Sequence, residues 1–252
     1  MSVNVADLSI IGPAFLAGLL VIATHVPLGT QVLSRGIVFV DLAVAQIAGL
    51  GVIVAAAAGF EAESWAVQAA ALSAALLGAL ALTWTEKKYP EVQEAIIGVA
   101  FILAASGAVV LLAGNVHAGE NLRDLLVGQI LWVPLKQLPL VALIDALILV
   151  VWFGWRGELS VRGFYLLFAC AVTVSVQLVG IYLVFASLII PPLATRHMKR
   201  FRLPVSYALG TMGYACGLAV SVAFDLPSGP TVVWALALLG IAVHVLVSAK
   251  TD

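Results

Sequence analysis

The sequence predicts an all-α, polytopic integral membrane protein with about eight transmembrane helices, arranged as one transmembrane domain over residues 1–252. Of the 252 residues, 63% are apolar and only 10% are charged, whereas a soluble domain carries about 25% charge. About 20 apolar residues in a helix span a bilayer. Eight runs approach or exceed that length, at residues 9–33, 36–60, 64–85, 92–114, 137–155, 163–191, 205–224 and 229–248.

The composition also argues against several other classes. The formal net charge is −1, so no overall charge draws the chain to nucleic acid. Cys170 and Cys216 both lie in apolar runs and are expected to be small core residues rather than a disulfide or a metal pair. The N-terminal stretch MSVNVADLSIIGPAF lacks the basic start of a cleaved signal, so we expect the first apolar run to remain as a helix.

The distribution of Lys and Arg between the runs predicts the orientation, because cytoplasmic loops are enriched in both residues. The second loop is acidic, with Glu61 and Glu63. The first, third and fifth loops carry basic residues, namely Arg35, Lys87, Lys88, Arg156 and Arg162. This alternation predicts an N-terminus outside the cell and a C-terminus in the cytoplasm.

The run at residues 163–191 does not fit a simple alternation, because basic residues flank it on both sides and place both of its ends in the cytoplasm. As one helix it would be about 43 Å long, which is too long for one ordinary pass and too short for two. We therefore expect a crossing helix over residues 163–178, a break near Gly180, and a short return helix that ends at Pro191. The alternative is a single tilted helix, with one loop that violates the charge rule.

A cluster of positive charge follows this run in VGIYLVFASLIIPPLATRHMKRFRLP, formed by Arg196, Lys199, Arg200 and Arg202. Pro191 and Pro192 are expected to stop the return helix, because proline lacks the backbone donor that continues it. The chain would then turn along the inner membrane surface as a short basic helix. This helix is either an anchor on lipid headgroups or a docking helix for a cytoplasmic partner. In the gap at 115–136, NLRDLLVGQILWVP is expected to form another short helix at the membrane surface.

Four stretches resemble motifs of the ABC-3 family of metal-ion permeases, and they occur in the family's order over nearly the whole chain. They are VPLGTQVLSRGIVFVDLAVAQIAGLGV, LLVGQILWV, VGIYLVFASLIIPPLATR and FDLPSGPTVV. The resemblance implies a bacterial inner-membrane permease subunit of an importer for divalent metal ions such as zinc, manganese or iron. The metal is then the substrate, and no cofactor is bound permanently.

The resemblance also implies a two-fold dimer, two ATP-hydrolysing subunits inside the cell, and an extracytoplasmic protein that delivers the ion. The chain itself contains no G-x-x-x-x-G-K-S/T sequence, so it is not the ATPase. The segment after the return helix would be the coupling helix, which contacts the ATPase subunit. Its candidate residues are Pro191, Pro192, Ala194, Thr195, Arg196, His197 and Arg200.

The chain departs from the family pattern at the expected ion-binding positions. Family members carry Asp and, four residues later, His on the second helix, where this chain has Leu42 and Gln46. Its carboxylate, Asp41, comes one residue earlier, about 100° around the helix. A further family Asp corresponds to Gln129. Because Gln46 replaces the histidine of the family pattern, we hypothesise that the transporter prefers harder ions such as manganese or iron(II) over zinc.

Ionisable residues inside membrane helices are costly, and each is therefore a functional hypothesis. The candidates for the translocation pathway are Asp41, Gln46, Glu94, Gln129 and Asp145 in the apolar runs, with His117 and Glu120 in an outer loop. Interhelical hydrogen bonds are the structural alternative for the first five, and ordinary loop polarity is the alternative for the last two. His25 and His244 are expected to be packing residues that make a hydrogen bond.

Two other functions remain open from the residues. A secondary transporter driven by a proton or sodium gradient would use Asp41, Glu94 or Asp145 as its relay and would need no ATPase. An intramembrane enzyme would have only the same three carboxylates as catalytic candidates, and no protease-type or phosphatase-type motif surrounds them. The permease hypothesis adds a path along the dimer interface and an alternating-access cycle.

Overall fold

The computed structural model describes residues 5–61, 64–112, 128, 130–154, 160–198 and 200–248. These residues form helices and connecting turns, with no strand among them. The α-helices are α1 (Val5–Arg35), α2 (Val40–Ala57), α3 (Trp65–Lys88), α4 (Gln93–Leu112), α6 (Leu138–Gly154), α7 (Val161–Val179), α8 (Ile181–Ala194), α9 (Arg202–Phe224) and α10 (Ser228–Ser248). Two short 3₁₀ turns, η1 (Pro90–Val92) and η2 (Ile130–Trp132), precede α4 and α6.

Seven of the described helices are long and apolar enough to cross a membrane, and α6 and α8 are shorter apolar helices. Large apolar side chains cover their outer faces, for example Val110 on α4 (73% exposed) and Trp234 on α10 (68% exposed). A soluble protein rarely exposes so much contiguous apolar surface, whereas lipid tails solvate it. The predicted fold class, an all-α polytopic membrane protein, is therefore confirmed.

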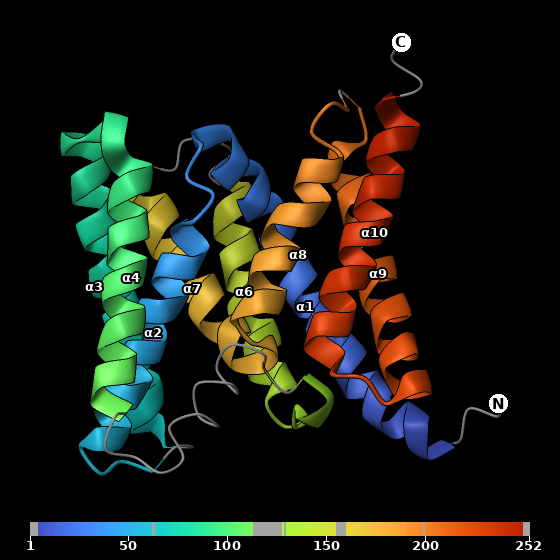
Figure 1. Cartoon of the computed structure of the whole chain (residues 1–252), viewed down its shortest axis with the longest axis horizontal. Coiled ribbons are helices and arrows are strands. Elements are labelled where there is room, and N and C mark those ends of the chain that lie inside the picture. Colours follow the sequence, from blue (N-terminus) through green and yellow to red (C-terminus); the bar gives the residue numbers. More distant parts are fainter. Residues whose placement is uncertain are drawn as a thin grey trace.

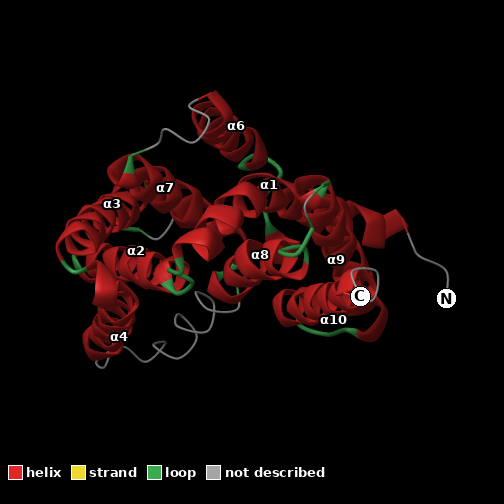
Figure 2. Cartoon of the chain, turned by 90° about the horizontal axis from the view of Figure 1, so that it is seen from above, coloured by secondary structure: helices red, strands yellow, loops and turns green. Residues whose placement is uncertain are grey.

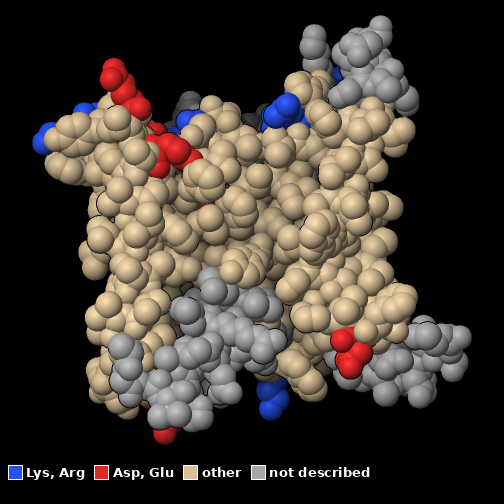
Figure 3. All heavy atoms as spheres, viewed as in Figure 1, with Lys and Arg blue, Asp and Glu red and all other residues tan. Residues whose placement is uncertain are grey.

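Successive helices run in opposite directions through the bundle. In Figure 1, α1 rises from bottom to top, α2 descends, α3 rises and α4 descends, and the same alternation runs from α6 up to α10. The ends of α1, α3, α6, α8 and α10 therefore share one end of the bundle, and most Lys and Arg side chains visible in Figure 3 lie there. We call this the basic end. The basic loops that the sequence placed on one side of the membrane do share one side.

The break in the run at 163–191 is confirmed, and the single tilted helix is wrong. Gly180 separates α7 from α8 with a φ of +81°, a conformation that favours glycine. Its amide still donates to the Val176 carbonyl at 2.9 Å, and its carbonyl accepts from Val184 at 3.1 Å. Because Val179, Gly180 and Ile181 are all buried, the broken backbone lies inside the protein and away from lipid.

Two expectations for the end of the return helix are wrong. Pro191 and Pro192 do not stop it, because α8 continues to Ala194. Residues 195–198, 200 and 201 then form turns and a bend, so no short basic helix forms in the described part of this segment. Proline removes the hydrogen bond to the carbonyl four residues earlier, and its ring crowds that carbonyl. For Pro192 that carbonyl is Leu188, and it lies directly against Gly29 of α1, where a side chain would clash.

The helices form two groups joined by α7. Viewed from above in Figure 2, α2 lies between α3 and α4, while α1 lies between α6 and α8, and α9 and α10 follow at the other side. Helix α7 packs on α3 and also contacts α1. As a result α2 and α8 are neighbours in the middle of one face, flanked by α4 and α10, and α6 lies on the opposite face (Figure 2).

Candidate functional site

Helix α2 begins below the basic end of the bundle, where the exposed Phe39 (49% exposed) precedes the buried Val40 and Asp41. Residues 36–39 carry the chain down from the end of α1 at the basic end (Figure 1). The Phe39 ring then stacks on Phe185 of α8, with centroids 6.5 Å apart and planes 4° apart. Phe185 lies nine residues before Ala194, the last residue of α8, or about 13 Å along the helix axis. The N-terminus of α2, with its positive dipole end, is thus well below the membrane surface.

Asp41 lies in the first turn of this buried helix start. Its side chain is fully buried (0% exposed). Within the described part of the chain, neither of its carboxylate oxygens has a hydrogen-bond partner. An isolated buried carboxylate costs several kcal/mol, so a site of this kind calls for a cation or a proton.

A second carboxylate reaches the same place from another helix. Glu94, half-buried in the first turn of α4, accepts a hydrogen bond at Oε1 from the Phe39 amide at 3.2 Å. Its Oε2 is buried and has no partner among the described residues. Because Phe39 is only two residues from Asp41, carboxylates from two helices lie near the N-terminus of α2. This pair is the strongest candidate site in the structure for a cation.

Gln46 is also buried on α2, with 6% of its surface exposed. It lies five residues after Asp41, which places the two side chains about 140° apart around the helix. The family arrangement, with ligands four residues apart on one face, would place Leu42 rather than Asp41 beside Gln46. Because the carboxylate of this chain comes one residue earlier, at Asp41, it lies on a different side of α2 from Gln46.

Asp145 belongs to a different region. It lies midway along α6, is 2% exposed, and has no partner for either oxygen among the described residues. Helix α6 packs against α1 and α7 on the face opposite to α2 and α4 (Figure 2). The structure thus does not bring Asp145 together with Asp41 and Glu94. No group of three or more His, Cys, Asp or Glu in the described residues is arranged to hold a metal.

The histidines and the outer-loop candidates have different outcomes. His25 is a packing residue as expected, fully buried, with Nδ1 2.9 Å from the Val21 carbonyl and 3.1 Å from Thr24 Oγ1. His244 is half-buried near the end of α10, with its ring 5.7 Å from the ring of His197. His117, Glu120 and Gln129 lie outside the described residues, so their proposed roles stay predictions.

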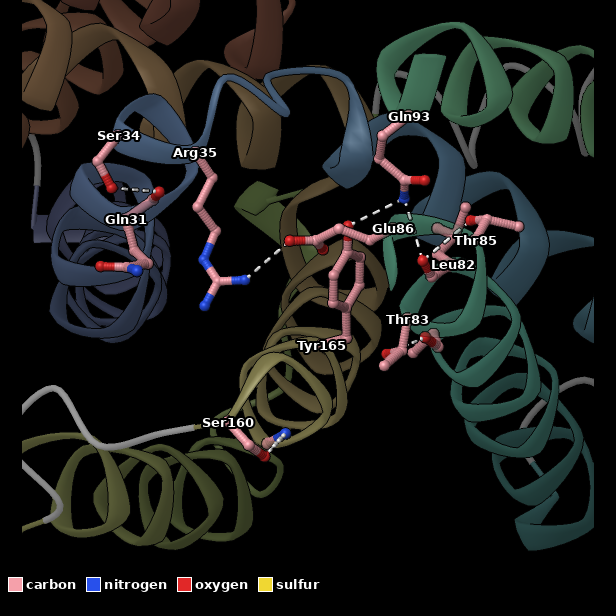
Figure 4. A network of polar contacts seen from close by, with 12 residues as sticks. Gln31, Ser34, Arg35, Leu82, Thr83, Thr85, Glu86, Gln93, Ser160 and Tyr165 are labelled. Atoms are coloured by element: carbon pink, nitrogen blue, oxygen red, sulfur yellow. Dashed lines mark hydrogen bonds and ion pairs between the residues drawn. The ribbon is translucent and has the colours of Figure 1, made fainter. Parts of the chain in front are cut away.

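The sequence reasoning missed a polar network at the basic end (Figure 4). Arg35 at the end of α1 pairs with Glu86 of α3 at 3.3 Å, and its guanidinium lies 4.5 Å over the Phe164 ring of α7. Gln93 donates to the Leu82 carbonyl at 3.0 Å and to the Tyr165 hydroxyl at 3.2 Å. The network joins α1, α3, α4 and α7. The only available signal was that Arg35 and Glu86 follow apolar runs that end on the same predicted side of the membrane.

The candidate coupling residues fall into two groups. Pro191, Pro192, Ala194 and Thr195 are buried, whereas Arg196, His197 and Arg200 are exposed. Thr195 Oγ1 is 2.7 Å from Ser206 Oγ of α9, which fixes the turn between the two helices. Only the exposed three can contact a partner directly, and the buried four support the turn that presents them.

An antiparallel bundle of membrane helices, with one helix broken inside the protein and carboxylates near a helix start, is typical of membrane transport proteins. The profile of the ABC 3 transport family matches residues 7–164 and 159–247 of the chain. The chain therefore belongs to the ABC 3 transport family, and the resemblance found in its motifs is confirmed.

Individual proteins share part of the sequence or the fold of the chain. The chain is 29% identical over 180 residues to the uncharacterized membrane protein slr2045 of Synechocystis sp., a match that covers 63% of this chain and 64% of that protein. It shares the fold of a chain in the solved structure of PsaBC from Streptococcus pneumoniae in complex with Fab, with a TM-score of 0.76, 17% identity, and coverage of 95% and 93%. A metal-chelate type ABC transporter in an inward-facing conformation gives a TM-score of 0.66 at 15% identity, covering 99% and 90%.

Proposed function

We propose that the chain is the membrane permease subunit of an ABC importer for divalent metal ions, namely zinc, manganese or iron(II). It would work as a dimer with two copies of an ATPase subunit and with an extracytoplasmic metal-binding protein. The ion would be its substrate, without any permanently bound cofactor. Membership of the ABC 3 transport family and the name of one structural relative, a metal-chelate type ABC transporter, support the class of substrate.

The observation that carries the proposal is the carboxylate pair at the start of α2. Asp41 is fully buried without a described partner, and Glu94 brings a second acidic group to the same helix start. A divalent cation would compensate both charges, and oxygen ligands suit manganese and iron(II) better than zinc. The described residues supply few ligands there, which fits transport, because a pathway site must release its ion as well as admit it.

The turn after α8 is the proposed contact with the ATPase. Arg196, His197 and Arg200 are exposed there, at the basic end that we assign to the cytoplasm. Below them, the buried Thr195–Ser206 contact ties the turn to α9, and α8 packs directly on α1. A displacement of the turn would therefore move α8 and α9 together, and α8 carries Phe185, which stacks on Phe39 beside the carboxylate pair. This contact path supports an alternating-access cycle driven from the turn.

A gradient-driven secondary transporter is the second candidate, and Asp145 is the observation that favours it. This carboxylate is buried without a described partner, and its helix α6 lies on the face opposite to α2 and α4 (Figure 2). A proton relay would use such a group, since it can be neutral in one state and charged in another.

One experiment separates the two functions. Metal uptake is measured in cells that lack the chromosomal copy of this chain and express either the wild type or Asp41→Asn, with the partner ATPase intact or inactivated in its phosphate loop. The importer proposal expects uptake only with wild-type chain and active ATPase. Uptake that persists without ATP hydrolysis and collapses with a proton uncoupler would replace the importer with the secondary transporter.

A further inference from the structure

An apolar groove lies between α8 and α10, and its possible ligand can be inferred independently of the transported ion. The groove has a volume of about 320 Å³. Ile190 and Leu193 of α8 form one wall, and Ala237 and Ile241 of α10 form the other. Gly240 forms the floor, because any Cβ there would lie 2.8 Å from Ile190 Cγ2. Its size is at the low end for ligand sites, which start at about 300 Å³.

Arg196 and His244 close one end of the groove. The Arg196 Nε donates to His197 Nε2 at 2.9 Å, and the His197 ring lies beside the His244 ring at 5.7 Å. This contact uses Nε and leaves the two terminal nitrogens of Arg196 available. Among the residues that the structure describes, no carboxylate pairs with Arg196, since the one ion pair found there joins Arg35 to Glu86. The groove therefore combines an apolar trough with a cationic head.

The position of the groove in the bundle matches the layers of a membrane. Both α8 and α10 end at the basic end (Figure 1), so the cationic head lies at the depth of the membrane surface. The apolar walls extend from there toward the middle of the bilayer, because they lie one to four residues before the end of α8 and seven to eleven residues before the end of α10. Acyl chains occupy the same depth as the walls, and lipid phosphates occupy the same depth as the head.

We infer that this groove is a binding site for an acidic phospholipid of the inner leaflet, with one acyl chain along α8 and α10 and the phosphate at Arg196. Arginine matches phosphate oxygens with two parallel hydrogen bonds. A metal ion on the histidine pair is disfavoured, because the Arg196 charge lies next to His197. The C-terminal ends of α8 and α10 themselves repel anions, so binding must depend on Arg196.

The test uses the purified full-length chain in detergent, with lipid binding measured by native mass spectrometry and by thermal stability. The probes are dioleoyl phosphatidylglycerol, dioleoyl phosphatidylcholine and inorganic phosphate. We expect one saturable phosphatidylglycerol per chain, and little effect of the other two. Equal binding of phosphatidylcholine would overturn the role of charge. Equal stabilisation by inorganic phosphate would overturn the role of the acyl chain.

Two variants with matched controls locate the site. Ala237→Phe fills the groove, and Ala146→Phe adds the same ring to an exposed position on α6. Arg196→Gln removes the head, and Arg200→Gln removes a neighbouring exposed arginine that does not line the groove. We expect lipid affinity to fall about fivefold in Arg196→Gln, to be lost in Ala237→Phe, and to be unchanged in both controls.

Other outcomes contradict the inference. Unchanged lipid binding in Ala237→Phe, together with a change in oligomer mass, would assign the groove to a second copy of the chain. Equal loss of lipid affinity in Arg196→Gln and Arg200→Gln would mean that general surface charge, rather than a specific contact with Arg196, attracts the lipid. If Ala237→Phe does not fold, Ala237→Leu provides a smaller obstruction with the same expected direction. Because no metal or ATPase is present, the result is independent of the proposed transport function.

Discussion

Replacement of Asp41 by Asn separates a functional role for this carboxylate from a structural one. The side chain is 0% exposed, and both oxygens lack partners among the described residues. An uncompensated buried charge costs about 3–5 kcal/mol, whereas a buried amide without partners costs about 1–3 kcal/mol. At a pH high enough to ionise the buried carboxyl, the difference predicts that Asp41→Asn stabilises the ion-free protein by about 2 kcal/mol. For a chain of this size that corresponds to a rise in Tm of about 4–8 °C.

The same substitution should abolish most transport, because the amide carries no charge to attract a cation. Thermal unfolding of the purified protein in detergent gives the Tm, and the metal content of complemented cells gives transport. Asp225→Asn is the matched control, since Asp225 is exposed in the turn after α9 and has a φ of 52° that Asn also tolerates. It should change neither quantity. A lower Tm together with lost transport in Asp41→Asn would show that Asp41 holds the bundle together, and would refute the reasoning.

Four further predictions test other parts of the structure. Gly180→Ala should destabilise the protein by about 1–3 kcal/mol, because its φ of +81° and ψ of 162° suit only glycine. The control is Gly98→Ala, at a helical glycine with open space around it, which should not destabilise the protein. Equal Tm values for the two variants would contradict the strained backbone at the break between α7 and α8. A double-mutant cycle of Arg35→Gln and Glu86→Gln should give a coupling of about 1 kcal/mol in denaturation, since the side chains are only 18% and 20% exposed; zero coupling would make the ion pair incidental. Arg196→Glu with Arg200→Glu should leave membrane insertion normal but abolish copurification of the ATPase, and retained copurification would remove the docking assignment. Gln46→His should shift metal accumulation toward zinc, because imidazole is a better ligand for zinc than an amide oxygen. Unchanged metal selectivity would contradict the hypothesis that the missing histidine changes the preferred ion.

The sequence by itself determined the class of the protein and the position of its helices. Long apolar runs leave few alternatives, because only helices and closed barrels satisfy their backbone in lipid. The break at Gly180 was also predictable. Basic loops on both sides of residues 163–191 forced the segment to return, and glycine was the residue that could turn it. Family motifs spread along the chain added the transport class, which the family profile confirms.

The outcome at Pro191 and Pro192 could not be deduced from propensity. Proline removes one hydrogen bond at a defined carbonyl, and whether the helix ends depends on what lies against that carbonyl. Here Gly29 of α1, more than 150 residues away in sequence, packs closely against Leu188, and α8 continues to Ala194. The local rule failed at a place where a tertiary contact lies against the carbonyl that Pro192 leaves without its helical partner.

In the candidate site, too, the sequence identified the residues, whereas only the structure showed which of them lie close together. The sequence identified Asp41, Glu94 and Asp145 because any ionisable residue in an apolar run is conspicuous. Only the tertiary structure brought Glu94 to the start of α2 through the Phe39 amide and left α6, the helix that carries Asp145, on the opposite face (Figure 2). Apolar periodicity reports which side of a helix avoids water, but in a membrane both lipid and protein satisfy that condition. Which helix faces which is decided by close packing between specific side chains, and that information is spread over the whole chain.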